Sequence, residues 1–236
     1  MGSRAGPGFD PGRSIMGFTL RNGISFCRVG DRIIFLDIVA DRYFCLSPDA
    51  EHSFRALAEG ALPPAGDVHL QGLLTRGLLM ASAAPEAPAA CRPIVMPRTS
   101  ILDLDLPRPA FAGTTSALCC LATSRVRLKM TGLGRTLSWL STRKSRLPTS
   151  RALPEGQVER IMAGFVSAAR LASQIDLCLT NSIAVASRMI AKGMRPDVVL
   201  GVQLGPFSAH CWVQHEDRLV NDRVDMVRTF TPILVL

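Results

Sequence analysis

The amino-acid sequence predicts an α+β protein, because helical and strand patterns occur in blocks rather than in strict alternation. Three short β-type runs and two helical stretches come first. A second block of helices is followed by strands that are typical of an antiparallel sheet. A stretch rich in Ala and Pro separates the two blocks. We therefore expect a small domain over residues 17–82, a linker over 83–104 and a larger domain over 105–236.

The first domain is expected to start with a β-meander. After a lead rich in Gly and Pro, Gly-Asp and Ala-Asp turns separate three runs of β-forming residues, at 24–29, 32–38 and 42–46. Ser47 and Pro48 then supply an N-cap and a first helical residue, so a helix is expected up to Gly60. A last helix near 67–76 would turn three leucines inward: Leu70, Leu73 and Leu74.

The second domain is expected to open with helices and to close with strands. Helical spacing predicts two helices within 109–146, interrupted near Gly132, and an amphipathic helix over 154–173. The next helix begins near residue 177 and stops at Gly193. Three strands are then expected in order: one over 198–204, one around His210 and one that holds Asp222.

Composition limits the class of protein. Hydrophobic residues make up 47% of the chain, which is enough for a buried core, and no apolar run reaches the roughly 18 residues of a membrane-spanning helix. The N-terminus lacks the apolar stretch of a secretory signal, so a cytoplasmic location and no membrane partner are expected. The seven cysteines include no C-x-x-C pair and no zinc spacing, which predicts free thiols and no metal site.

The net charge of +8 is concentrated in the second half of the chain. Residues 1–90 carry a net charge of −1 and residues 91–236 carry +9, and the segment 125–151 has eight basic residues and no acidic one. This segment is either a solvated helical face or a contact for an acidic partner or an anionic stretch of substrate. Few aromatic residues lie among the basic ones and no binding motif is present, which argues against nucleic acid.

Three residues near the C-terminus have the types and local settings of a thiol-nucleophile site. Cys178 lies in the first turn of its helix, where free N–H groups and the helix dipole favour a thiolate. His210 could activate the thiol and then protonate a leaving amine, and Asp222 could orient the imidazole. The charge of Asp176 opposes the dipole, because it raises the pKa of the thiol, so a neighbouring imidazolium would have to dominate.

The pairing of His210 with Asp222 depends on the turn between their strands. A three-residue loop over 215–217 places the two residues opposite each other on one face of the hairpin. A two-residue loop at Glu216 and Asp217 places Asp222 opposite Cys211, on the other face. We therefore expect the three-residue loop if the two residues act together.

Each of the three residues also has an ordinary structural interpretation. A cysteine in an apolar helix is commonly a core residue, and a histidine beside Trp212 is commonly a packed, hydrogen-bonded one. Asp222 could simply terminate a strand. The order and the setting of the three residues together favour catalysis over these separate explanations.

Three motifs surround these residues: CLTNSIAV at 178–185, FSAHCWV at 207–213 and VND at 220–222. They resemble the C-L-x-x-S-h-A-h, F-x-A-H-x-W-V and h-N-D motifs (h is apolar) of lasso peptide biosynthesis B proteins, which are transglutaminase-like cysteine peptidases. The resemblance covers about 105–236 and implies a transglutaminase- or papain-like domain with a catalytic triad of Cys178, His210 and Asp222. Asn181 and Gln214 stand where that family commonly has Arg and Glu, which bears on substrate or partner contacts.

The N-terminal domain carries the segment DIVADRYFCLSP at 37–48, between predicted strands and a predicted helix. This segment and the order of elements resemble the PqqD-like precursor recognition element, a winged helix-turn-helix-like domain with a three-stranded sheet. The resemblance implies that a leader peptide adds a strand to the sheet edge. The groove would be formed by Arg42, Tyr43, Phe44, Leu70, Leu73 and Leu74. Alternatively, Tyr43 and Phe44 simply divide between core and surface.

Together the two resemblances imply a leader peptidase in the maturation of a ribosomally made peptide (RiPP). The first domain would hold the precursor leader and the second would hydrolyse the leader–core amide, which frees an amine for a lasso cyclase similar to asparagine synthetase. No bound cofactor is expected: the family implies ATP use only together with the cyclase, and no phosphate-cradling Gly loop is present. The alternatives are a transglutaminase-like acyl transferase and a non-catalytic module that binds a leader or a nucleic acid.

Overall fold

The computed structural model describes residues 17–61, 64, 66–148, 154–170 and 178–236. The chain forms two compact units, Met1–Ile24 with Leu46–Ala90 and Ser25–Cys45 with Cys91–Leu236. These units divide the chain differently from the predicted boundaries. The three-stranded meander and the second half of the predicted linker both belong to the larger unit. One reason is a backbone bond between them, since the N–H of Cys91 donates to the carbonyl of Phe26 at 2.9 Å.

The smaller unit combines two helices with a two-stranded antiparallel sheet: α1 (Pro48–Ala58), α2 (Val68–Thr75), β1 (Gly17–Leu20) and β5 (Leu79–Ser82). Both predicted helices are confirmed. Asp67 caps α2, because its Oδ1 accepts hydrogen bonds from the N–H groups of His69 and Leu70. Ser47 precedes α1 as expected but makes no side-chain cap bond. The winged helix-turn-helix arrangement stays a prediction.

The meander predicted from the turn residues is confirmed as a three-stranded sheet in the order β2 (Ile24–Val29), β3 (Arg32–Asp37) and β4 (Arg42–Phe44). Its turns use the left-handed region at Gly30, with a φ of 58°, and at Asp41, with a φ of 50°. Side chains from β2 and β3 enter the core of the larger unit, namely Cys27, Ile34 and Leu36. The sheet is therefore part of the packing of that unit.

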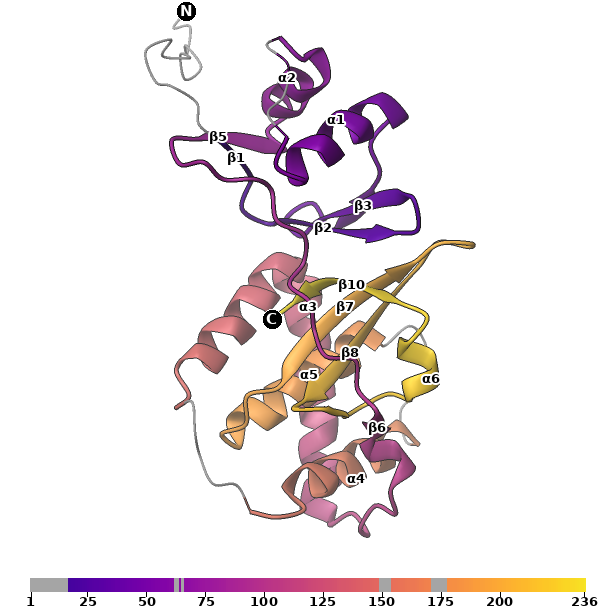
Figure 1. Cartoon of the computed structure of the whole chain (residues 1–236). Coiled ribbons are helices and arrows are strands. Elements are labelled where there is room, and N and C mark those ends of the chain that lie inside the picture. Colours follow the sequence, from indigo (N-terminus) through magenta and orange to yellow (C-terminus); the bar gives the residue numbers. More distant parts are fainter. Residues whose placement is uncertain (1–16, 62–63, 65, 149–153, 171–177) are drawn as a thin grey trace, which may run out of the picture. The chain divides into compact units, whose positions relative to one another are not determined.

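The main sheet of the larger unit has the order β10-β7-β8-β9-β6 (Figure 1). Its strands are β6 (Thr99–Ser100), β7 (Asp197–Gln203), β8 (Ser208–His215), β9 (Arg218–Leu219) and β10 (Thr231–Val235). All neighbours are antiparallel except β6 and β9, which run parallel. The predicted order, helices first and an antiparallel sheet after them, is thus confirmed as an α+β fold, with β6 as an addition from the predicted linker.

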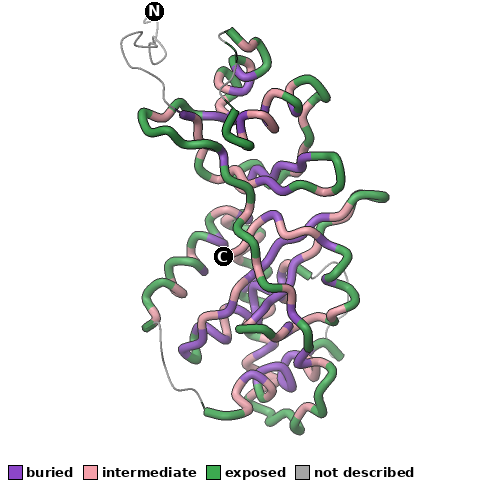
Figure 2. The backbone as a smooth tube through the Cα atoms, in the orientation of Figure 1, coloured by how far each residue is buried: buried purple, intermediate pink, exposed green. Residues whose placement is uncertain are grey.

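Helices pack against this sheet, and buried residues are concentrated in β7, in β8 and in the helices Gln157–Ala169 and Cys178–Ala191 (Figure 2). The helices are η1 (Ile101–Asp103), α3 (Phe111–Ser145), α4 (Gln157–Ala169), α5 (Cys178–Ala191) and α6 (Val224–Val227). Gly132 breaks α3 with a φ of 74° and a ψ of 175°, which confirms the predicted interruption. Among the described residues, no helix has the length and apolar character to cross a membrane.

The strands β7 and β8 divide their side chains between two apolar clusters, as the period of two requires. One face contributes Val198, Leu200, Val202, Cys211 and Val213 to the core that contains α5. The other face contributes Val199 and Trp212 to a second cluster with Leu219, Val227 and Phe230. Burial of both faces holds β8 in a fixed register and orientation between α5 and α6.

Candidate active site

Cys178 is the first residue of α5 and is exposed, whereas the following turns of the helix are buried. Small side chains let α5 approach β8, and one of them bonds to the strand: Ser182 Oγ donates to the carbonyl of Cys211 at 2.8 Å. The same oxygen accepts from Asn221 Nδ2 at 2.9 Å. Ser182 is fully buried, so these bonds fix the start of α5 against the strand that carries His210.

His210 lies on β8 between the thiol and an acid. Its Nε2 bonds to Oδ2 of Asp222, and the imidazole lies close enough to the Cys178 thiol for each group to shift the pKa of the other. Because Nε2 is occupied by the carboxylate, Nδ1 is the ring nitrogen that remains available to the thiol. The ring packs near Phe230, with ring centroids 5.1 Å apart, and near Trp212, at 6.3 Å. The structure therefore brings together the three residues that the sequence singled out.

The turn that leads to this arrangement differs from the predicted one. His215 pairs with Arg218, so the hairpin closes with a two-residue turn at Glu216 and Asp217, and the expected three-residue loop over 215–217 is wrong. Glu216 adopts a φ of 58°, which suits a two-residue hairpin turn. In this register Asp222 would lie opposite Cys211 if the ladder continued. The ladder does not continue that far, because β9 ends at Leu219.

Asn221 explains how Asp222 still reaches His210. The N–H of Val213 donates to Oδ1 of Asn221 at 2.7 Å, so a side-chain oxygen takes the place of the next backbone acceptor. The chain bends here instead of continuing as a strand. Asp222 thus lies in a bend after β9, not on the predicted strand, and the bend carries its carboxylate to the imidazole.

Two further contacts hold Asp222 in place. Ser100 Oγ, on β6, donates to the carbonyl of Asp222 at 2.5 Å. The N–H of Arg223 donates to Oδ1 at 2.7 Å, which leaves Oδ2 for His210. Ser100 lies within the predicted linker, and its role depends on the parallel pairing of β6 with β9. No local sequence signal indicates such a contact, whereas the neighbouring Asn221 was visible as part of the VND motif.

The electrostatics of the site favour a thiolate–imidazolium pair. The hydrogen bond from His210 lowers the pKa of the Cys178 thiol, and the N–H groups of Cys211 and Leu179 lower it further, against the opposing effect of burial. The bond to Asp222, followed by the bond to Cys178, raises the pKa of His210 to about 9. The imidazolium therefore stabilises the thiolate, as the sequence analysis expected would be needed to outweigh the charge of Asp176. Asp176 itself lies outside the described residues.

The other perturbed thiols shift in the opposite direction. Burial raises the pKa of Cys27 and of Cys211 to about 12, and it also raises the pKa values of Cys91 and Cys120. Cys178 is the only described cysteine for which a lowered pKa is resolved. This contrast identifies Cys178 as the nucleophile candidate.

The ion pair predicts a pH dependence that separates two reactions. Alkylation of Cys178 by iodoacetamide should begin well below the ordinary thiol pKa of 9.0 and should remain fast at high pH, because the thiolate persists. Acyl transfer that needs the His210 proton for the leaving amine should instead decline as the pH rises through about 9. Site-resolved mass spectrometry measures the first reaction, with exposed Cys119 as the internal reference. Equal modification of Cys178 and Cys119 at pH 7 would contradict the ion pair.

Gly201 makes room for the aromatic side of the site. It lies opposite His210 on β7, and a Cβ there would come within 2.6 Å of the Trp212 ring and 2.9 Å of the Phe230 Cβ. We expect Gly201→Ala to lower the free energy of unfolding by about 1–3 kcal/mol through overpacking, and to lower activity by displacing Trp212. Urea unfolding measures the change. Gly113→Ala, in α3, meets no atom within 4 Å and should be neutral or slightly stabilising, and a similar loss in both variants would exclude the packing explanation.

The residues predicted to bind a leader fall in both units. Arg42, Tyr43 and Phe44 form β4 in the larger unit, and Tyr43 packs against Phe207 with ring centroids 5.5 Å apart. Burial raises the pKa of Tyr43 to about 12, and negative charges nearby, including that of Cys178, add to the rise. The leucines lie on α2 in the smaller unit, where Leu70 and Leu73 are buried and Leu74 is half-buried.

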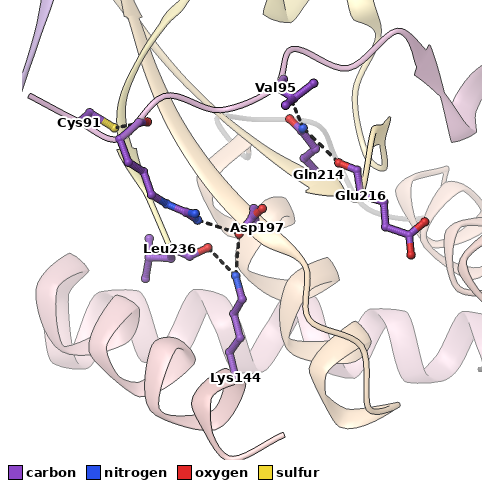
Figure 3. Close-up of polar contacts among 8 residues, drawn as sticks. Cys91, Val95, Lys144, Asp197, Gln214, Glu216 and Leu236 are labelled. Atoms are coloured by element: carbon purple, nitrogen blue, oxygen red, sulfur yellow. Dashed lines mark hydrogen bonds and ion pairs between the residues drawn. The ribbon is translucent and has the colours of Figure 1, made fainter. Parts of the chain in front are cut away.

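Gln214 and Asp197 anchor the far end of β7 and β8 (Figure 3). Gln214 Nε2 donates to the carbonyl of Val95 at 2.6 Å and to that of Glu216 at 3.3 Å, so the amide stabilises the two-residue turn. Lys144 Nζ lies 2.7 Å from both Asp197 Oδ1 and the carbonyl of Leu236. Gln214 therefore acts on the hairpin that positions His210, which gives this residue a structural role.

Comparison with known families agrees with the geometry. A thiol at a helix start, a histidine on an adjoining strand and an acid behind it define a thiol-nucleophile domain. Residues 120–235 match the family described as the Transglutaminase-like superfamily, so this part of the chain is a transglutaminase-like domain. The match includes Cys178, His210 and Asp222. No curated protein and no solved structure matched the chain. Members of the superfamily are often cysteine peptidases or transferases.

Among the described residues, no group of three His, Cys, Asp or Glu side chains could hold a metal ion.

Proposed function

We propose that this protein is a cysteine endopeptidase that removes the leader from a ribosomally made precursor in lasso peptide maturation. The observation that carries the proposal is the series Cys178–His210–Asp222, in which His210 on β8 bonds to Asp222 in the bend after β9 and lowers the pKa of Cys178 in the first turn of α5. A Cys-His-acid series supports acyl transfer through a thioester.

The reaction follows from the charged pair. The Cys178 thiolate attacks the carbonyl carbon that joins leader to core, and a tetrahedral intermediate forms. When the C–N bond breaks, His210 gives its proton to the departing amine of the core. Water then attacks the thioester while His210 takes a proton from it, which releases the leader carboxylate and restores the thiolate. Asp222 holds the ring in place and stabilises its cationic form.

Features of the larger unit support a peptide substrate. β4 is an edge strand of its sheet, and an edge can accept an extended peptide through backbone hydrogen bonds. Tyr43 on this strand lies close enough to Cys178 to sense its charge, and it contacts exposed Phe207. A peptide that runs along β4 would pass near the thiol with apolar side chains against this aromatic pair. Leu70 and Leu73 are buried, so Leu74 is the one of the three leucines that is better placed to contact a leader.

The test is mass spectrometry of the full chain with a leader-bearing precursor peptide, in the presence and absence of a small primary amine. The proposal expects two fragments whose masses sum to that of the precursor plus one water, with or without the amine. An amide-linked product between the leader fragment and the amine would instead assign the chain as an acyl transferase. Precursor that binds but remains intact would assign it as a binding module. The released core, with its free amine, would be the substrate for a lasso cyclase similar to asparagine synthetase.

A further inference from the structure

A cavity of the larger unit lies apart from the thiol and is lined by basic side chains. It has a volume of about 270 Å³ and is bounded by the segment before α3, the first turns of α3 and α4, and the end of α5. Four cationic residues line it: Arg108, Arg160, Arg188 and Lys192. The lining includes no Asp or Glu, so the cavity carries a strong local excess of positive charge.

Acidic side chains of the described residues neutralise some basic residues of the unit but not these four. Lys144 and Arg92 contact Asp197, and Arg218 contacts Glu159. Within the part of the chain that the structure describes, the four cavity cations make no ion pair and no side-chain hydrogen bond. Like charges gathered around one hollow repel each other, and an anion in the hollow would remove that repulsion.

Helix electrostatics account for only two of the four cations. Arg188 and Lys192 lie at the C-terminal end of α5, where the helix dipole favours positive charge. Arg160 lies near the N-terminal end of α4, and Arg108 lies just before α3, where the dipole disfavours a cation. An anion bound between them would reverse that effect.

The start of α3 forms part of the cavity wall, where the N–H of Gly113 already donates to the carbonyl of Ala110 at 2.8 Å. Its N-cap, Ala110, has no side-chain acceptor, and its first turn contains no acid. Gly113 also lines the cavity, and a Cβ at this position would meet open space. Gly164 brings α4 close to this point, since a Cβ there would lie 2.8 Å from the Gly113 carbonyl oxygen. The positive end of the α3 dipole beside four cations is a suitable setting for an oxyanion.

From these observations we propose that the cavity binds a small, multiply charged oxyanion of the phosphate class, such as a pyrophosphate or triphosphate group. Several negative charges on one compact group match four cations around a hollow of this size. The site is independent of the thiol chemistry, because α5 places Arg188 ten residues from Cys178, about 15 Å along the helix axis. Bound anion bridges α3, α4 and α5 and so stabilises the larger unit.

The experiment is isothermal titration calorimetry of the full chain with sodium tripolyphosphate, pyrophosphate and orthophosphate, at an ionic strength held constant with NaCl. Thermal unfolding is measured in parallel. We expect saturable binding of one tripolyphosphate per chain, weaker binding of orthophosphate, and a rise in Tm on binding. Cys178→Ala should bind tripolyphosphate as the wild type does, which separates this site from the proposed peptidase function.

Matched variants decide whether the cavity is the site. Arg108→Gln and Arg160→Gln should each weaken tripolyphosphate binding at least about tenfold, at the level expected for a lost charge-assisted contact. Arg125→Gln and Lys129→Gln remove the same charge from exposed positions of α3 outside the cavity and should change binding less than about twofold. Equal losses in all four variants, or the absence of saturable binding by the wild type, would overturn the proposal.

Discussion

Replacing Cys178 by alanine should abolish precursor cleavage, with kcat/KM lowered by at least about 10⁴-fold. The thiolate supplies the covalent intermediate, and neither the imidazole nor the carboxylate can form a thioester in its place. Quantitative mass spectrometry of leader release under single-turnover conditions measures the effect. Binding of the precursor should be nearly unchanged, because the substitution removes one exposed side chain at the start of α5 and no core contact.

Cys119→Ala is the matched control for this experiment. Cys119 is also exposed, lies on α3, and has no part in the bonded series at the site. It should cleave at the wild-type rate. A Cys178→Ala variant that still released the leader would eliminate the peptidase mechanism, whereas loss of cleavage in both variants would point to a general effect of thiol removal.

Local sequence signals predicted the long helices of the larger unit, the meander, β7 and β8, but not β6, α6 or β10. Alternation of apolar residues located the strands, and helix-start and helix-stop residues located α4 and α5. The motifs around Cys178 and His210 indicated a thiol-nucleophile site. These predicted helices and strands are confirmed because each depends on residues within one or two turns of the chain.

The contacts between elements were not predictable in the same way. Ser100 is 122 residues from Asp222 in the sequence, and its bond depends on a two-residue parallel strand in a stretch that composition marks as a linker. Likewise, the meander has its own local pattern, yet that pattern does not indicate that Cys27, Ile34 and Leu36 pack into the larger core. Long-range packing decided both cases.

The His–Asp pair shows how side chains can overrule a backbone register. The two-residue turn sets a register that would separate the partners if the ladder continued. Asn221 ends the ladder by bonding to Val213, and Ser182 ties the same asparagine to α5. The amide of Asn221 therefore replaces the next backbone contact of the ladder. This replacement makes the two-residue turn compatible with a bonded His210–Asp222 pair.

Asp222→Asn should lower kcat/KM by about 10³-fold or more while the fold is retained, since the amide is nearly the size of the carboxylate but carries no charge. The bond to Asp222 is the largest cause of the raised His210 pKa, so this pKa should fall from about 9 toward its ordinary value of 6.5. A smaller fraction of His210 is then protonated near pH 7, so the imidazole stabilises the Cys178 thiolate less. Alkylation of Cys178 should therefore become slower near pH 7 and should need a higher pH to reach its maximum rate.

The measurement is the pH profile of iodoacetamide modification at Cys178, compared with Asp225→Asn. Asp225 is exposed in the first turn of α6, three residues after Asp222, and its removal changes the charge equally without touching His210. A shifted profile in Asp222→Asn alone would show that the carboxylate acts through the imidazole on the thiol. An unshifted profile with lost activity would mean that Asp222 only orients the ring, because orientation affects proton transfer in acylation but leaves the charge of the thiolate unchanged.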